Sequence, residues 1–275
     1  MFGINKVFND GLPMILPPRD DAIFKKIMTS EETRPALKGL ISAVVGYDIS
    51  EILMVNSELP KSNYFEKGER FDVNCKTDTG EQINIEMQAN PMTGDNSDNT
   101  HENFRSRIVL YLTDLFAKQD KQKVYSEYKK TYCVAFCDYT IWKDEQFIRK
   151  FYLTDENGIK LSDKICAIVI ELDKIGKLIE KKNVAEMTAT ERWAFYLKCI
   201  DNPDYEKTFL ELIEREEAFK VATNALTSIS KNEQFIRKFY LTDENGIKLS
   251  DKICAIVIEL DKIGKLIEKK NVAEM

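Results

Sequence analysis

The sequence predicts an α/β or α+β fold in which a sheet is flanked by helices. Short runs that alternate apolar and polar residues, or are wholly apolar, are typical of strands. Segments with apolar residues at helical spacing are interspersed with them along the chain, which favours a mixed architecture. With 275 residues, 43% of them hydrophobic and 31% charged, the composition is that of an ordinary globular protein with a sizeable core.

The helices are predicted from their ends. Asp20-Asp21 precedes AIFKKIM and places acidic side chains at the positive end of a helix. A second helix follows Arg34-Pro35 and ends before Gly46. Residues 104–119 form an amphipathic helix with Tyr111 on its apolar stripe. Two more helices are expected, one from the capping box at Thr188–Glu191 and one from Asn202-Pro203 to about Leu226.

The strands are predicted from residue alternation and turn signals. Residues 49–59 are extended, residues 131–142 form a buried strand, and residues 70–88 form a hairpin. Asp78-Thr79-Gly80 suits a three-residue hairpin loop. With the hairpin centred on Thr79, Asp72 lies opposite Glu86 on its polar side.

A run of 43 residues, Glu145 to Met187, recurs letter for letter as Glu233 to Met275. Perfect identity at exposed and buried positions alike indicates a recent duplication or an assembly error, not a solenoid repeat. Each copy is predicted to form a strand, a turn, a second strand and a short basic helix. Only one copy fits one place in the sheet, so the second must pack elsewhere, pair edge to edge, dimerise or stay partly disordered.

Only one histidine, His101, is present, in a polar stretch where we expect a loop and assign no role. Serine-hydrolase triads, cysteine–histidine proteases and histidine-based metal sites need a histidine in a defined role and usually several. Most of these chemistries are therefore excluded, and an enzyme built on this chain has to use carboxylates, lysines or cysteines. The six cysteines form no CxxC pair and are expected to be reduced core thiols.

Lys and Arg total 40 against 46 Asp and Glu, for a net charge of −6. A negative net charge excludes a protein that binds nucleic acid over most of its surface, and it allows only a local basic path. No stretch approaches the roughly 20 apolar residues of a membrane span, and MFGINKVFND has no apolar signal core. We therefore expect a cytoplasmic protein with no membrane partner.

The facing carboxylates of Asp72 and Glu86 repel each other unless a positive group lies between them. Mg²⁺ is one candidate, and Arg70, Lys76 or open solvent are others. The structural alternative is a solvated hairpin face whose charges point apart into water. Spacing alone does not decide between these interpretations.

Asp72, thirteen intervening residues and then Glu86-Met87-Gln88 resemble the D…ExK hairpin of the PD-(D/E)XK nuclease superfamily. This segment looks specifically like the recombination-promoting nuclease and transposase family, in which the third motif residue, usually lysine in the superfamily, is commonly glutamine. Further pieces stand in the family's order across roughly residues 12–220. They are DAIFKK at Asp21–Lys26, the basic residues Lys67 and Arg70, an R-x-x-x-Y helix with Arg107, Tyr111 and Phe116, and the ERW of Glu191-Arg192-Trp193.

The resemblance implies a restriction-endonuclease-like mixed central sheet flanked by helices, with a helical C-terminal part. It also implies a metal-dependent DNA endonuclease that hydrolyses phosphodiester bonds in recombination or mobile-element context. Asp72 and Glu86 would hold one or two Mg²⁺ ions, with Mn²⁺ as a substitute. Gln88 would position the attacking water in place of the usual lysine, which predicts a slow enzyme. Asp21 would either complete the metal shell or cap its helix.

The resemblance further implies DNA contacts from Lys25, Arg70, Arg107 and Tyr111, although core packing is favoured for Tyr111. Residues 118–130 concentrate five lysines with interleaved tyrosines, as a backbone-contact stretch or a solvated loop. Cutting both strands with one centre per chain usually requires two copies, so a homodimer is compatible with this interpretation.

The expected organisation is a nuclease-like core at residues 1–142, a β-hairpin and helical extension of the same domain at 143–230, and the duplicate at 231–275. The alternative function is a catalytically inactive remnant of the fold that acts as a DNA-binding or protein-interaction module, because the second copy replaces the C-terminal segment that the family carries.

Overall fold

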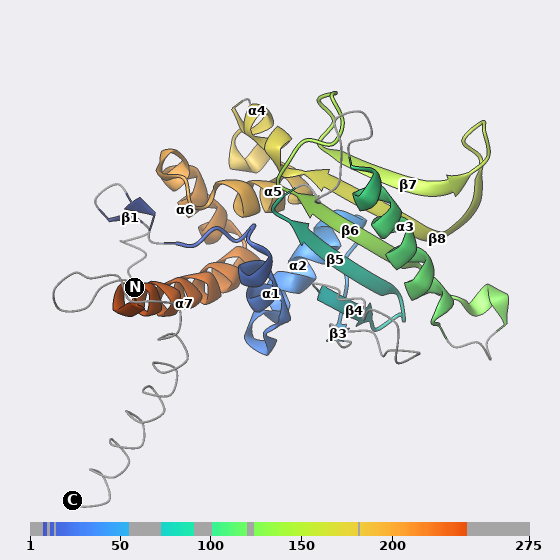
Figure 1. Cartoon of the computed structure of the whole chain (residues 1–275), viewed down its shortest axis with the longest axis horizontal. Coiled ribbons are helices and arrows are strands. Elements are labelled where there is room, and N and C mark those ends of the chain that lie inside the picture. Colours follow the sequence, from blue (N-terminus) through green and yellow to red (C-terminus); the bar gives the residue numbers. More distant parts are fainter. Residues whose placement is uncertain are drawn as a thin grey trace, which may run out of the picture. The chain divides into compact units, whose positions relative to one another are not determined.

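The computed structural model describes residues 8–9, 12–13, 15–54, 73–90, 101–119, 124–180 and 182–240. The chain divides into two units, residues 1–227 and residues 228–275. The first unit holds the sheet and the helices that cover it (Figure 1). Of the second unit, the described residues are 228–240, which form the end of a helix.

The predicted mixed sheet is confirmed. It has six strands in the order β3-β4-β5-β6-β8-β7. β6 pairs in parallel with β5 and with β8, and the other neighbours are antiparallel. A separate antiparallel pair is formed by two-residue strands near the N-terminus. The strands are β1 (Phe8–Asn9), β2 (Leu12–Pro13), β3 (Ile52–Met54), β4 (Val73–Thr77), β5 (Gln82–Gln88), β6 (Thr131–Cys137), β7 (Ile148–Thr154) and β8 (Lys160–Glu171).

The helices alternate with the strands and then dominate the C-terminal part, as predicted. The α-helices are α1 (Asp21–Thr29), α2 (Arg34–Val45), α3 (Glu102–Ala117), α4 (Ile175–Ile179), α5 (Ala189–Cys199), α6 (Glu206–Arg215) and α7 (Glu217–Tyr240). Short 3-10 turns are η1 (Glu31–Thr33), η2 (Tyr125–Glu127), η3 (Leu172–Lys174), η4 (Val184–Glu186) and η5 (Pro203–Tyr205).

The central strand β6 is buried along its whole length and carries apolar side chains to both faces of the sheet. Cys133 and Ala135 belong to a core cluster with α3, which therefore covers one face. The ring of Phe136 lies 6.2 Å from that of Phe24 on α1, so α1 covers the opposite face. Figure 1 shows α3 in front of the strands and α2 behind them, with α1 beside the end of β5.

The predicted helix ends are confirmed where a capping residue marks them. The Asp20 carboxylate accepts hydrogen bonds from two backbone N–H groups at the start of α1. Gly46 ends α2 with φ at 92°, a left-handed conformation that costs glycine little. Thr188 and Glu191 form the predicted capping box of α5, each side chain accepting from the other residue's N–H.

The predicted single helix over residues 202–226 is wrong. The backbone of Glu216 is extended and separates α6 from α7. Arg192 of α5 pairs with Glu216, Nε to Oε1 at 2.5 Å. Just beyond the break, the ring of Phe219 lies 4.3 Å from that of Trp193. These contacts hold the chain against α5 at the bend and just after it, and packing therefore overrides the local helix signal.

Two predicted strands are longer than the observed ones. The strand predicted over 131–142 ends at Cys137. The Asp138 N–H still donates to the Gln88 carbonyl at 2.8 Å, and the chain then turns away from β5. Of the extended segment predicted at 49–59, residues 52–54 form β3, and residues 55–59 lie outside the described part of the chain.

The two copies of the duplicated sequence do not fold alike at their start. The first copy supplies β7, β8 and α4. In the second copy, residues 233–240 continue α7, so the first strand predicted for this copy is wrong, and residues 241–275 lie outside the described residues. The same letters form a strand where β8 pairs with them and a helix where they extend one already nucleated.

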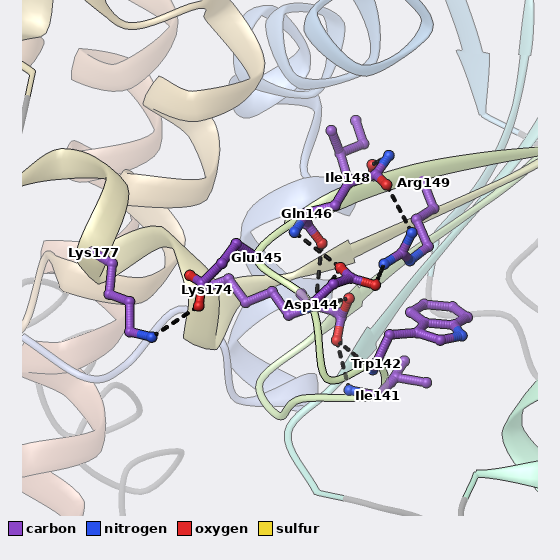
Figure 2. Close-up of polar contacts among 10 residues, drawn as sticks. Ile141, Trp142, Asp144, Glu145, Gln146, Ile148, Arg149, Lys174 and Lys177 are labelled. Atoms are coloured by element: carbon purple, nitrogen blue, oxygen red, sulfur yellow. Dashed lines mark hydrogen bonds and ion pairs between the residues drawn. The ribbon is translucent and has the colours of Figure 1, made fainter.

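A buried carboxylate anchors the loop between β6 and β7 (Figure 2). Glu171, at the end of β8, has no exposed surface, and its Oε1 accepts from the backbone N–H groups of Ile141 at 2.6 Å and Trp142 at 3.0 Å. Its Oε2 lies 2.7 Å from the Lys174 ammonium. Because both oxygens have partners, the charge is tolerated in the core and fixes the loop.

The five cysteines within the described residues are free and buried, which confirms their prediction as core thiols. Burial raises the pKa of the Cys75 thiol to about 12. In the part of the chain that the structure describes, no helix is both long and apolar enough to cross a bilayer.

Candidate functional site

The β4–β5 hairpin has the predicted register. Val73 pairs with Ile85, which centres the hairpin on Thr79. The Gly80 N–H donates to the Thr77 carbonyl at 2.9 Å, and Gly80 has φ at 89°. This is the geometry of a three-residue loop closed by a left-handed glycine, as the sequence predicts.

Two predicted site residues, Asp72 and Arg70, lie outside the described residues, so the pairing of Asp72 with Glu86 stays a prediction. Glu86 itself is on the face of β5 that α3 covers, next to Ala135 of β6. It is only 2% exposed. The alternative of a solvated hairpin face therefore does not hold for this carboxylate.

Asn84 and Arg107 are two described residues that contact the Glu86 carboxylate. Asn84, two residues earlier on the same face, donates from Nδ2 to Glu86 Oε1 at 2.9 Å. Arg107 of α3 lies with Nη2 3.6 Å from Glu86 Oε2. The guanidinium also lies over the Tyr111 ring, 5.7 Å from its centroid. A buried carboxylate is stable only with such partners, so α3 completes the environment of Glu86.

Asp21 reaches the same end of β5. Its neighbour Asp20 caps α1, which leaves the Asp21 carboxylate to accept a hydrogen bond from the Ala89 N–H, one residue beyond Gln88. Burial raises the pKa of Asp21 above its ordinary value, and the charge of Asp20 adds to this. The Ala89 hydrogen bond and the charge of Arg107 oppose the rise.

The other predicted residues divide between the site and the core. Gln88 is half-buried at the end of β5 and donates from Nε2 to the Met87 carbonyl at 2.9 Å. Lys25 is half-buried on α1, one turn after Asp21. Tyr111 is buried in the cluster under α3, in agreement with the core-packing alternative.

The basic stretch at 118–130 is partly described, and both of its ends form side-chain contacts with other residues. Lys118 pairs with Asp114 at 2.8 Å and Lys130 with Asp163 at 3.0 Å. The Gln119 side chain donates to the Lys129 carbonyl and accepts from its N–H. These contacts hold the stretch in place and offset the charge of two of its lysines.

Sequence reasoning missed two buried polar residues, Asn84 beside Glu86 and His101 at the start of α3. Asn84 is fully buried, and its Oδ1 has no hydrogen-bond partner among the described residues. His101, expected in a loop, is buried at the start of α3 with φ at 71°, and its ring stacks on Tyr139 with centroids 5.1 Å apart. Alternation places Asn84 on the polar face of the hairpin, but nothing in the local sequence signals that a helix covers this face.

The mixed sheet carries Glu86 on its β4–β5 hairpin, α3 covers this carboxylate, and α1 adds that of Asp21. This arrangement defines an α/β domain with a carboxylate site. Over residues 18–245 the sequence matches the model of a protein family described as "PD-(D/E)XK nuclease family transposase", so the chain belongs to this family. Comparisons with curated proteins and with solved structures give no significant match.

Proposed function

We propose that this chain is a metal-dependent DNA endonuclease that hydrolyses phosphodiester bonds in a recombination or mobile-element context. The observation that supports it best is the buried Glu86 carboxylate on the β4–β5 hairpin, held by Asn84 and Arg107, with the Asp21 carboxylate bound at the neighbouring Ala89. Family membership makes the hairpin the expected place for the reaction.

The donor set suits a hard divalent cation. Glu86 and Asp21 offer carboxylate oxygens, the ligands that Mg²⁺ and Mn²⁺ prefer. Within the described ranges no three His, Cys, Asp or Glu side chains are gathered for a metal, and in the proposed site Asp72 supplies the third carboxylate. A bound ion would lower the pKa of a water and offset the charge of the scissile phosphate.

The chain's own residues orient the substrate. Gln88 carries an amide that orients the attacking water by hydrogen bonding, but it supplies no positive charge. Arg107 is a cation in contact with Glu86, and its guanidinium can move from this carboxylate to a phosphate of the substrate. Lys25 and Arg70 extend the basic path along the DNA backbone. Tyr111 supports Arg107 from below.

The test is nicking of supercoiled plasmid by the purified chain with Mg²⁺, with Mn²⁺ and with EDTA. We expect nicking that requires the metal and that falls by more than about 100-fold in Asp72→Asn and Glu86→Gln, since changing residues that only orient a metal ligand already costs about 10–100-fold. Mn²⁺ binding by calorimetry, weakened in both variants, gives a readout independent of turnover.

Glu81→Gln is the matched control, because Glu81 lies on the same hairpin but at its loop end, where its carboxylate accepts from Tyr47 at 2.7 Å. It should nick as the wild type does. Nicking that persists in EDTA, or that is equal in all three variants, would falsify the proposal.

The second candidate function is a catalytically inactive domain that binds DNA. One observation favours it, namely that Glu86 already has Arg107 as its counter-charge. This function predicts DNA binding that EDTA leaves unchanged, no nicking with either metal, and no Mn²⁺ binding that depends on Glu86.

A further inference from the structure

The outer edge of the sheet is formed by β7. Within the described part of the chain only β8 pairs with it (Figure 1). The Glu171 N–H donates to the Phe147 carbonyl at 2.8 Å, and the β7–β8 register continues from this pair. Backbone groups of successive residues point to opposite sides of an antiparallel strand. Ile148, Lys150 and Tyr152 therefore direct their N–H and C=O groups to the open edge.

Large apolar side chains are exposed along this edge and its hairpin. Leu161 keeps 79% of its surface exposed and Ile159 keeps 69%, and Phe151, Tyr152 and Leu153 are exposed as well. β7 contains neither proline nor glycine, residues that often interrupt or blunt an edge strand. An apolar patch beside open backbone groups is typical of an interaction surface.

The sequence of β7 is complementary to itself in the antiparallel sense. If two β7 strands pair about Tyr152, Phe151 lies opposite Leu153 and Arg149 lies opposite Asp155, and the two-fold axis repeats each contact. In this register the residues that face the partner are Lys150, Tyr152 and their symmetry mates, which agrees with the groups left open by β8.

The charged residues of this match are held in place. Arg149 lies over the Trp142 ring, 4.8 Å from its centroid, and pairs with Asp144. Asp155 uses Oδ1 to accept from the turn N–H groups of Asn157 and Ile159. The cation and the anion thus lie at opposite ends of one strand, and an antiparallel partner with the same sequence matches both ends.

We propose that β7 is the interface through which two copies of this chain pair edge to edge, antiparallel and centred on Tyr152. The sheet then continues through both copies. The exposed side chains of Phe151, Leu153 and Leu161 are covered in the pair. This proposal is independent of nuclease activity, because none of these residues belongs to the candidate site.

The first test is the mass of the full chain in solution by analytical ultracentrifugation. The wild type should approach twice the 31.8 kDa of one chain. The double variant Leu153→Asp/Leu161→Asp should associate at least tenfold more weakly. The duplication provides a matched control, because Leu241→Asp/Leu249→Asp makes the same two changes in the same local sequence and should leave the dimer intact.

The second test addresses the register. Directly opposite residues of an antiparallel pair have Cα atoms about 5.5 Å apart, a separation that a disulfide can bridge. Tyr152→Cys should therefore form a disulfide between two chains under a mild added oxidant, whereas Tyr240→Cys, its counterpart in the second copy, should not.

Three outcomes of the ultracentrifugation test would overturn the proposal. They are a wild type that stays monomeric, a dimer that survives the change at Leu153 and Leu161, and a dimer lost equally when Leu241 and Leu249 are changed. A cross-link through Tyr240→Cys but not through Tyr152→Cys would place the contact in the second copy and overturn it as well.

Discussion

The guanidinium of Arg107 lies 3.6 Å from the Glu86 carboxylate, and this pair joins α3 to the β4–β5 hairpin. Neither Nη2 nor Nε of Arg107 makes a hydrogen bond to a described residue. The contact is therefore an attraction between charges and not the bidentate fork that arginine can form. Its strength depends on burial, because only 3% of the Glu86 side chain and 21% of the Arg107 side chain are exposed.

Arg107→Gln should lower the free energy of unfolding by about 1–3 kcal/mol, since it leaves Glu86 buried without its counter-charge. Urea unfolding followed by tryptophan fluorescence measures the change. Arg105→Gln is the control, because Arg105 is exposed on the same helix, and it should stay within about 0.5 kcal/mol of the wild type. Equal losses in the two variants would mean that the pair with Glu86 adds nothing to stability.

The hairpin register could be predicted, but the burial of Glu86 could not. Alternation assigns each residue to one face of a strand, and the loop around Thr79 fixes which residues pair. Whether a face is solvated depends on a helix elsewhere in the chain, and α3 supplies it. The ion pair of Arg107 with Glu86 could not be predicted for the same reason, and the DNA contact that the family resemblance implies for Arg107 stays a prediction.

Gly80→Ala should cost about 1–2 kcal/mol of unfolding free energy, because a left-handed conformation at φ 89° is strained for a residue with a Cβ atom. The added Cβ would also lie 3.3 Å from Cγ of Lys129, a flexible side chain that can move aside. Gly158→Ala isolates the backbone cost, since its φ is 83° and, apart from its chain neighbours, no described residue comes within 4 Å of the added Cβ.

The two alanine variants should therefore agree within about 0.5 kcal/mol in urea unfolding. A much larger loss in Gly80→Ala would instead show that Lys129 is held rigidly against the loop. No loss in either variant would contradict the left-handed geometry of both turns.

Asp21→Asn should change the pH dependence of stability. Burial raises the pKa of Asp21 above 3.8, so the folded chain binds this proton more tightly than the unfolded chain does. The stabilising contribution is full below the ordinary value and is lost as pH rises through the raised value. The stability of Asp21→Asn relative to the wild type should therefore increase from pH 3.5 upward and level off above the raised pKa.

Urea unfolding of both proteins between pH 3.5 and pH 7 measures this difference. A difference that is constant with pH would show that the hydrogen bond from Ala89 and the charge of Arg107 balance the desolvation of Asp21, and a difference that falls as pH rises would show that they outweigh it.

The duplicated segment shows how far local sequence reaches. The pattern IRKFY predicts a strand in both copies, yet residues 148–152 form β7 and residues 236–240 end α7. The two copies have the same sequence and therefore the same local propensity, so their surroundings decide the structure. In the first copy β8 forms backbone hydrogen bonds with this segment, whereas in the second copy the segment continues the helix α7. Capping residues at Asp20 and Thr188 were reliable because their effect is local.

The identical sequence of the two copies makes a test of the core possible. Glu171→Ala should cost about 3–5 kcal/mol, because it removes the carboxylate that accepts from Ile141 and Trp142 and leaves the Lys174 ammonium, 8% exposed, without that partner. Asp144, 3.6 Å from Lys174, offsets part of this loss (Figure 2).

Glu259→Ala is the control, because it changes the corresponding glutamate of the second copy, but the position in the sheet is already filled by Glu171. Its effect on urea unfolding should stay within about 0.5 kcal/mol. If Glu259→Ala proved as destabilising as Glu171→Ala, the two copies would have to share the place beside β6, and the order of strands in the sheet would differ from the one described.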